Sequence, residues 1–364
     1  MIRLLVLALL PLAVPAAGGT LRVNGFEHAP VASGGSNYHW YALGPGCDRE
    51  PYGVLANYHR PGVRAQVIDQ LGQMRAAGQD RIATGVIHLR APWPTGGAWT
   101  GTLLDSTGGD LHPTYKANLA LFLADIGAAG FAQVLFRYFP QGGNDPQYWS
   151  AWDEDRYQEN WNLVWNLEAV LQASGLDYLT DLGVELMPRA RILDLPGYPL
   201  VRPEEPANPV LTEYARRLWR EYVSQFGAGH SVGFSFVSDD DRVRTEARVR
   251  HLPTVYTGPW SAGVWPAALA LDLYGTARAG EATMIRRHDS HVRGIPGAAA
   301  LPWIIAEAYY DDAGAAGGVL EGMADTGRQV LWLAQWPLAR GDACGDGVNQ
   351  APPAQFGHWK RRGF

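Results

Sequence analysis

Short apolar runs alternate along this chain with longer segments in which apolar residues recur three and four positions apart. The short runs are typical of buried strands, and the longer spacing is typical of helices that bury one face. Eight predicted strands cover residues 37–43, 81–89, 132–139, 177–186, 231–237, 267–274, 302–309 and 329–335. Seven predicted helices cover residues 64–77, 113–129, 156–174, 210–226, 241–252, 277–292 and 315–325. This alternation predicts an α/β protein, and eight strands favour a single (β/α)8 TIM barrel.

Residues at the helix ends support this division. Pro113 begins one predicted helix, Gly130 follows its end, and Gly175 closes the next helix. An open doubly wound sheet is the alternative, although no G-x-G-x-x-G motif follows an early strand. Because no repeat or linker divides the chain, residues 18–364 are predicted to form one domain with short extensions at both ends.

The first 17 residues have the pattern of a cleavable signal peptide. Arg3 precedes an apolar run over residues 4–14, and the small residues Ala16 and Ala17 suit a cleavage site. The run is too short to span a membrane, and no later stretch is long and apolar enough. The sequence therefore predicts a secreted or periplasmic protein without a membrane span.

Composition narrows the classes of partner. The net charge is −6 and no basic run occurs, which argues against nucleic acid. The 14 Trp and 16 Tyr residues suit both core packing and stacking against sugar rings. We expect a monomer with a carbohydrate partner.

The two cysteines, Cys47 and Cys344, predict one disulfide in an exported protein. They follow the first and last predicted strands, which are neighbours in a closed barrel. Two free buried thiols are the alternative.

Barrel enzymes carry their active groups at the carboxyl ends of the strands. Polar or aromatic residues end every predicted strand, and they are, in strand order, His39 and Trp40, His88 and Arg90, Arg137 and Tyr138, Asp181 and Glu185, Ser238 to Asp240, Asp272 and Tyr274, Glu307 and Tyr309, and Gln335 and Trp336.

Glu185 and Glu307 are distinctive because each follows a long apolar strand, the fourth and the seventh. Strand alternation predicts that Glu185 shares an inward face with Asp181 and Gly183, and that Glu307 shares one with Trp303 and Ile305. Strands four and seven lie across the barrel mouth from each other. Two carboxylates facing across a cleft are what glycoside cleavage requires.

The stretches "DLGVELMP" around Glu185, "WIIAEAYYDD" around Glu307 and "LAQWPL" around Trp336 resemble the clan of retaining glycoside hydrolases with barrel folds, which includes cellulase-like and mannanase-like enzymes. The resemblance implies that Glu185 is the acid/base and Glu307 the nucleophile, and that no cofactor or metal is used. It also implies an aromatic residue after strand eight, here Trp336. One position departs from the clan, which has Asn directly before the acid/base residue, whereas this chain has Val184.

Other strand-end residues are candidates for substrate binding or for support of the nucleophile. Arg90 and Arg137 could hold the nucleophile ionised or could pair with Asp181, and Tyr274 or Tyr309 could donate a hydrogen bond to it. The predicted substrate-binding set is His39, Trp40, His88, Arg90, Arg137, Asp272, Tyr274, Tyr309, Gln335 and Trp336. Candidate sugar platforms are Trp40, Trp93, Trp149, Trp152, Trp260 and Trp336.

Two other functions remain open. A metal-dependent hydrolase would gather His39, His88, His230, Asp240 and Asp272, but no H-x-H or H-E-x-x-H motif occurs. A non-catalytic carbohydrate-binding barrel would keep the aromatic residues without the acid pair. A separation of about 5–5.5 Å between the Glu185 and Glu307 carboxyl groups would indicate a retaining enzyme, and about 6.5–9.5 Å an inverting one.

Overall fold

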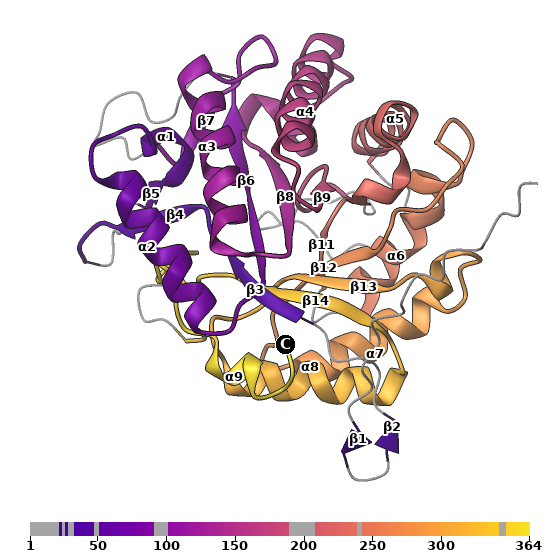
Figure 1. Cartoon of the computed structure of the whole chain (residues 1–364). Helices are drawn as coiled ribbons and strands as arrows, with labels where there is room; N and C mark the ends of the chain where they lie inside the picture. The colour runs from indigo at the N-terminus through magenta and orange to yellow at the C-terminus, as the bar shows by residue number, and fades with distance from the viewer. Residues whose placement is uncertain are drawn as a thin grey trace, which may run out of the picture.

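The structure is a computed structural model of the whole chain (Figure 1). It describes residues 22–23, 26–27, 33–46, 51–90, 101–188, 208–238, 242–341 and 347–364. The predicted signal peptide, both cysteines, Trp93, Asp239 and Asp240 lie outside these residues. The signal peptide and the disulfide therefore stay predictions.

A parallel sheet forms the centre of the molecule. Its strands are β3 (Ser33–Asn37), β6 (Arg81–Leu89), β8 (Gln133–Pro140), β9 (Tyr178–Asp181), β10 (Ser231–Gly233), β11 (Phe236–Ser238), β12 (Leu269–Leu273), β13 (Trp303–Glu307) and β14 (Val330–Gln335). The pairing runs β10-β9-β8-β6-β3-β14-β13-β12-β11. Since β10 and β11 are two halves of the segment 231–238, the sheet returns to its starting segment, and the predicted (β/α)8 barrel is confirmed.

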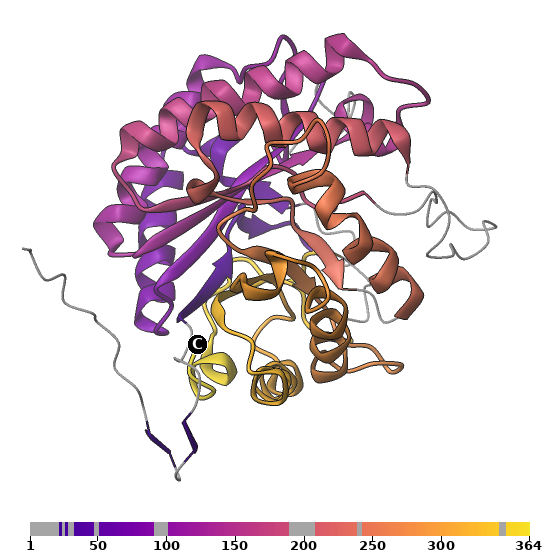
Figure 2. The same ribbon diagram turned by 90° about the vertical axis from the view of Figure 1, so that its right-hand side faces the viewer.

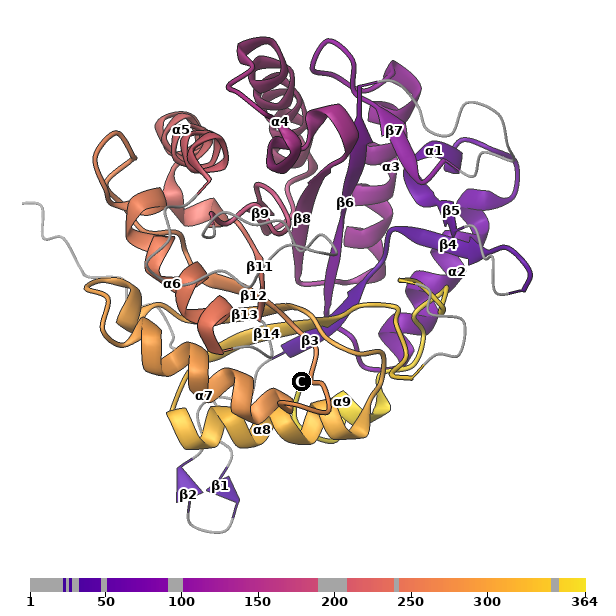
Figure 3. The same cartoon turned by 180° about the vertical axis from the view of Figure 1, so that it is seen from behind.

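Long helices surround this sheet on its outside (Figures 2 and 3). They are α2 (Val63–Ala76), α3 (Pro113–Ala129), α4 (Glu154–Ser174), α5 (Pro209–Phe226), α6 (Arg242–Tyr256), α7 (Glu281–Val292) and α8 (Ala313–Thr326). The side chains of Asp153 and Asn208 cap α4 and α5 by accepting backbone N–H bonds, and Gly130 and Gly175 end α3 and α4 with left-handed backbone.

Short elements complete the described part of the chain. They are the hairpins β1 (Arg22–Val23) with β2 (Phe26–Glu27) and β4 (Trp40–Leu43) with β5 (Pro51–Gly53), the strand β7 (Leu103–Asp105) beside β6, the single turns α1 (Val54–Asn57) and α9 (Gly357–Lys360), and four 3₁₀ turns. After β14 the C-terminal tail packs beside β3, where the backbone carbonyl of Pro353 accepts from Ser36 and Gln79.

The first barrel strand is the main correction to the predicted elements. The prediction placed it over 37–43, but β3 covers Ser33–Asn37, and residues 40–43 form β4, which pairs with β5 in a separate antiparallel sheet. The sequence of β3, SGGSN, contains no apolar side chain. Its glycines permit close packing, because a Cβ on Gly35 would lie 1.6 Å from the backbone oxygen of Arg81. Hydrophobicity therefore could not reveal this strand.

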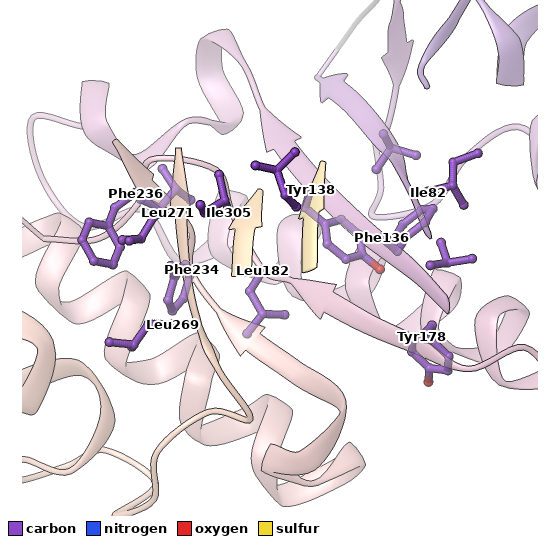
Figure 4. Close-up of a cluster of buried hydrophobic side chains, with 14 of the residues drawn as sticks. Ile82, Phe136, Tyr138, Tyr178, Leu182, Phe234, Phe236, Leu269, Leu271 and Ile305 are labelled. Atoms are coloured by element: carbon purple, nitrogen blue, oxygen red, sulfur yellow. The ribbon is translucent and has the colours of Figure 1, made fainter. Parts of the chain in front are cut away.

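Apolar side chains fill both faces of the sheet. The barrel interior holds small and aliphatic residues from seven of the paired strand segments, together with one tryptophan: Ala83, Leu135, Leu179, Val232, Ala268, Ala270, Ile304, Ala306, Trp332 and Ala334. A larger cluster lies between the sheet and the helices (Figure 4), and it includes Ile82, Phe136, Phe236, Leu271 and Ile305.

This division corrects the predicted face of Trp303 and Ile305 on strand seven. Ile304 faces the interior, whereas Trp303 and Ile305 pack outward. Glu307 nevertheless reaches the interior, because the pairing of β12 with β13 shifts register just before it. On the fourth strand, β9 ends at Asp181, so simple alternation no longer positions Glu185.

No helix among the described residues has both the length and the apolar character needed to cross a membrane.

Candidate active site

Glu307 lies at the carboxyl end of β13 with only 9% of its surface exposed. Its Oε1 accepts a hydrogen bond from Arg137 Nη1 at 2.7 Å, and its Oε2 accepts one from the hydroxyl of Tyr274 at 2.8 Å. Both carboxylate oxygens therefore have a donor, which fixes the orientation of the group. Tyr274 directly follows β12, the neighbouring strand.

Arg137 is fully buried on β8 and uses all five of its N–H donors. Its Nε donates to Asp181 at 3.1 Å, Nη1 to Asn37 at 3.0 Å and to Glu307, and Nη2 to Ser235 and Asp272 at 3.1 Å each. The acceptors come from strands or strand ends around the barrel. Arg137 thus pairs with Asp181, one of its two predicted interactions, and it contacts Glu307 as well.

The pKa of Glu307 is raised above that of an ordinary glutamate, chiefly by burial. Arg137 and the hydroxyl of Tyr274 oppose this effect, and the negative charge of Glu185 adds to it. Arg137 therefore offsets only part of the desolvation of Glu307, and the lowered pKa expected for a nucleophile beside an arginine is not the outcome.

Glu185 occupies the turn that follows β9 and has a positive φ of 60°. Its own N–H donates to the carbonyl of Ser235 at 2.9 Å, and the N–H of Val184 donates to that of Tyr138 at 3.1 Å. Left-handed backbone at a residue with a side chain costs about 1 kcal/mol or more, and such strain concentrates at functional sites. The flanking strands hold this turn in place.

One cavity of about 650 Å³ is lined by both Glu185 and Glu307. Val184 lines it too, so the position at which the resembling clan has Asn faces the same space. The two carboxylates, predicted from opposite strands, are thus brought to one cavity at the barrel mouth.

Aromatic side chains form one wall of this cavity. Trp40 and Trp336 both line it and meet edge to face with ring centroids 5.3 Å apart. Trp336 is anchored by its Nε1, which donates to the carbonyl of Gly347 at 2.6 Å. His39 packs behind them against Phe139, and burial lowers its pKa to about 3, so it is neutral.

The predicted substrate-binding residues thus separate into three groups. Trp40 and Trp336 line the cavity. His39, Arg137, Asp272 and Tyr274 lie in the packing or hydrogen-bond network around it. Tyr309 packs edge to face on Tyr274 and stacks under Arg340. The other three have different partners: His88 contacts the hydroxyl of Ser106, Arg90 pairs with Glu159, and Gln335 bonds to Ser36 and to the backbone of residues 311 and 355.

The remaining sugar-platform candidates in the described chain do not line this cavity. Trp149 is buried and donates to the carbonyl of Gly143, and Trp152 stacks with Arg217. Trp260 is 75% exposed on the loop between α6 and β12.

Sequence reasoning missed several residues at the site. Asn37 and Ser235 bind Arg137, but neither follows an apolar run, so nothing in the sequence distinguished them. Gln141, Gln147 and Tyr148, in the segment after β8, line the cavity, and Tyr148 is 68% exposed. Aromatic residues in a loop after a barrel strand were the available signal for Tyr148.

Among the residues that the structure describes, no three His, Cys, Asp or Glu side chains gather as a metal site would require. His88 is buried with a pKa lowered to about 3, and His230 stacks on Tyr178 at the start of β9. Asp240 lies outside the described residues.

No protein-family model matches this sequence, and no curated protein does. Solved structures do match the fold. A GH5_18 protein from Streptomyces cattleya in complex with GlcNAc is 14% identical, with a TM-score of 0.53, and the match covers 92% of this chain and 79% of that one. A mutant of the glycoside hydrolase 5 lichenase from Caldicellulosiruptor sp. F32, in complex with cellotetraose, is 10% identical, with a TM-score of 0.53, and the match covers 96% and 100%.

The chain spans about half of another match, the exo-β-1,4-mannosidase from Opitutaceae bacterium strain TAV5, at 15% identity, a TM-score of 0.48 and coverage of 90% of this chain and 55% of that one. At such low identities the likeness shows a shared fold and nothing more. The barrel that the sequence resemblance implied is therefore the fold that this chain shares with glycoside hydrolase 5 proteins.

Proposed function

We propose that this protein is a retaining glycoside hydrolase that acts on a polysaccharide or oligosaccharide. The observation that carries the proposal is the placement of Glu185 and Glu307, from the ends of strands four and seven, on one cavity of about 650 Å³. The shared fold adds to it, because the neighbours include glycoside hydrolase 5 proteins.

In the proposed reaction Glu307 attacks the anomeric carbon while Glu185 protonates the departing oxygen. The glycosyl ester on Glu307 is then hydrolysed by water that Glu185 deprotonates. Arg137 and Tyr274 hold the Glu307 carboxylate in place before attack, so little reorganisation is needed. This double displacement requires no cofactor or metal.

The two carboxylates have environments suited to different tasks. Glu307 is held by two donors in a buried position, as an attacking group must be. Glu185 is less buried and carries no hydrogen bond from Arg137, and it lies on the cavity beside exposed Tyr148. It can therefore meet both the leaving group and the incoming water.

The cavity wall fits a sugar ring. Trp40 and Trp336 offer apolar surface, while Gln141 and Gln147 supply amide groups that can bond hydroxyls. The abundance of aromatic residues and the open barrel mouth favour action within a chain. Because one neighbour is a complex with cellotetraose and another with GlcNAc, a substrate panel should begin with β-linked glucans and N-acetylglucosamine-containing oligosaccharides.

The test compares wild type, Glu307→Gln and Glu185→Gln on that panel. Glu321→Gln is the matched control, because Glu321 is an exposed glutamate on α8. We expect hydrolysis by the wild type and the control, with the first product formed carrying the anomeric configuration of the substrate, as measured by proton NMR. Full hydrolysis by either active-site variant would remove that residue from its role. Sugar binding without hydrolysis by the wild type would instead favour the non-catalytic barrel.

We also propose that the protein acts outside the cytoplasm. The support is the signal-peptide pattern of residues 1–17. Export should remove that segment, and mass spectrometry of the exported protein would detect the new N-terminus. An intact N-terminus on protein that stays in the cytoplasm would contradict the proposal.

A further inference from the structure

Three buried carboxylates share one buried cation at the base of the cavity. Arg137 contacts Asp181 at 3.1 Å, Asp272 at 3.1 Å and Glu307 at 2.7 Å. Among the described residues, no second basic side chain forms an ion pair with any of the three. If all three were ionised, the cluster would hold an excess of two negative charges away from water. Like charges at such distances do not all stay ionised, so the cluster favours holding a proton.

The donors around each carboxylate differ in number. Asp181 accepts from the backbone N–H groups of Gly183 and Ser235 on Oδ1 and from Arg137 on Oδ2. Glu307 has one donor on each oxygen. Asp272 accepts only from Arg137 Nη2 through Oδ1, and its buried Oδ2 has no partner within the described part of the chain. Asp272 is therefore the carboxylate whose negative charge is least supported.

The charged groups around Asp272 also favour its protonated form. Burial raises its pKa well above that of an ordinary aspartate, and the negative charge of Glu307 on β13 is the next cause. Asp181 on β9 and Glu185 in the following turn add to the rise, and Arg137 on β8 alone opposes it. Tyr274, two residues along the chain, keeps its proton because burial raises its pKa too.

We propose that Asp272 is protonated in the resting protein and acts as a positioning residue for Glu307. When Asp272 is neutral, the positive charge of Arg137 stabilises only the carboxylates of Asp181 and Glu307. Glu307 can then be the ionised member of the pair that it forms with Asp272. The purpose assigned to this proton rests on the proposed nucleophile role of Glu307, whereas the protonation state itself does not depend on any activity.

Infrared spectroscopy tests the protonation state directly, because a protonated carboxyl group has a carbonyl stretch that a carboxylate lacks. The spectrum of the wild type is recorded at pH 8 and compared with that of Asp272→Asn. Glu168→Gln is the control, since Glu168 is another buried carboxyl group, with a pKa raised by burial to about 7. We expect the band in wild type and in Glu168→Gln, and its loss in Asp272→Asn. A spectrum without the band, or a band that survives in Asp272→Asn, would overturn the proposal.

A second variant leaves Asp272 itself unchanged and tests its link to Glu307. Glu307→Gln removes the neighbouring negative charge, so Asp272 should ionise at lower pH and its band should titrate away earlier than in wild type. An unshifted titration would break the link. Because neither measurement uses catalysis, a protein that shows both effects but hydrolyses nothing would retain the protonated Asp272 and lose only the proposed glycosidase activity.

Stability gives an independent readout. The folded state retains a proton on Asp272 at pH values where the unfolded chain has lost it, so the contribution of Asp272 to wild-type stability falls as pH rises above about 4. Relative to Asp272→Asn, the unfolding equilibrium constant of wild type should rise by up to about tenfold per pH unit until Asp272 ionises in the folded protein. A pH-independent ratio in urea titrations would contradict a protonated Asp272.

Discussion

The ends of strands four and seven carry the two proposed catalytic carboxylates in contrasting ways. At the end of β13, Glu307 is buried and both of its oxygens are bound, so its position follows from Tyr274 and from Arg137, which four other side chains hold in place. After β9, Glu185 lies in a turn with left-handed backbone, and its own N–H and that of Val184 donate to the carbonyl groups of Ser235 and Tyr138. One carboxylate is fixed through its side chain, and the other through its backbone.

This contrast indicates a division of labour. A nucleophile must approach one carbon along one line, which a fixed carboxylate can do. A group that first donates a proton and then removes one must meet two different partners, which suits a less constrained side chain. The strain at Glu185 is then part of how the chain directs that side chain toward the cavity.

The largest expected effect distinguishes the two carboxylates by their dependence on the leaving group. Glu307→Gln should lower kcat about 10⁴-fold or more on every substrate, because no group replaces the nucleophile. Glu185→Gln should lower kcat/KM about 10²–10⁴-fold on unactivated sugars and much less on aryl glycosides, because kcat/KM reports the first step, in which an aryl leaving group needs no proton. Steady-state kinetics on both substrate types measures this, and equal losses for the two variants on aryl glycosides would erase the distinction.

Loss of the buried cation should be the largest effect on stability. Arg137→Met leaves Asp181, Asp272 and Glu307 without their shared cation and should lower the free energy of unfolding by about 3–5 kcal/mol in urea titrations. The matched control is Arg90→Met, because Arg90 is half-exposed in its ion pair with Glu159 and should contribute only about 0–1 kcal/mol. Similar losses of unfolding free energy in both variants would show that the Arg137 network does not hold the end of β13 in place.

Removal of the tyrosine hydroxyl should have a smaller effect on rate, with a distinctive pH dependence. Tyr274→Phe removes a donor to the Glu307 carboxylate and should lower kcat/KM about 10–100-fold. Because that donor favours the ionised form, its loss raises the pKa of Glu307 further. The acid limb of the wild-type profile should already lie above the usual glutamate pKa of about 4.3, and in Tyr274→Phe it should move to still higher pH. An acid limb that stays in place would separate Tyr274 from Glu307.

The smallest effect tests the strain at strand four. At a φ of 60°, Glu185→Gly should be more stable than Glu185→Ala by about 1 kcal/mol, because glycine tolerates left-handed backbone. Thermal and urea unfolding of the two variants would measure the difference. A more stable alanine variant would mean that this turn is not strained in solution.

The sequence predicted much of the fold because its signals are local. The structure has α3 over Pro113–Ala129 and β6 over Arg81–Leu89, the same bounds as predicted, since helical periodicity with Pro and Gly at the ends, or a continuous apolar run, defines such elements. The glycine-rich β3 carries no such signal, because its contribution is close backbone packing.

The site was predictable only in outline. Glu185 and Glu307 were found because they end apolar runs on the appropriate strands. Their faces could not be read from alternation, since a register shift precedes Glu307 and a turn precedes Glu185. Arg137 binds Asp181, Asp272 and Asn37, which lie 44 to 135 positions away from it along the chain. No rule of sequence spacing predicts contacts between residues so far apart.

The central claim is that Glu185 and Glu307 act as a pair across one cavity, and the distance between their carboxyl groups tests it most directly. A crystal structure with a bound sugar would supply that distance. The account predicts about 5–5.5 Å, the spacing at which one group attacks while the other protonates. A separation of about 6.5–9.5 Å would indicate an inverting enzyme, and a larger one would contradict the pairing of these two residues altogether.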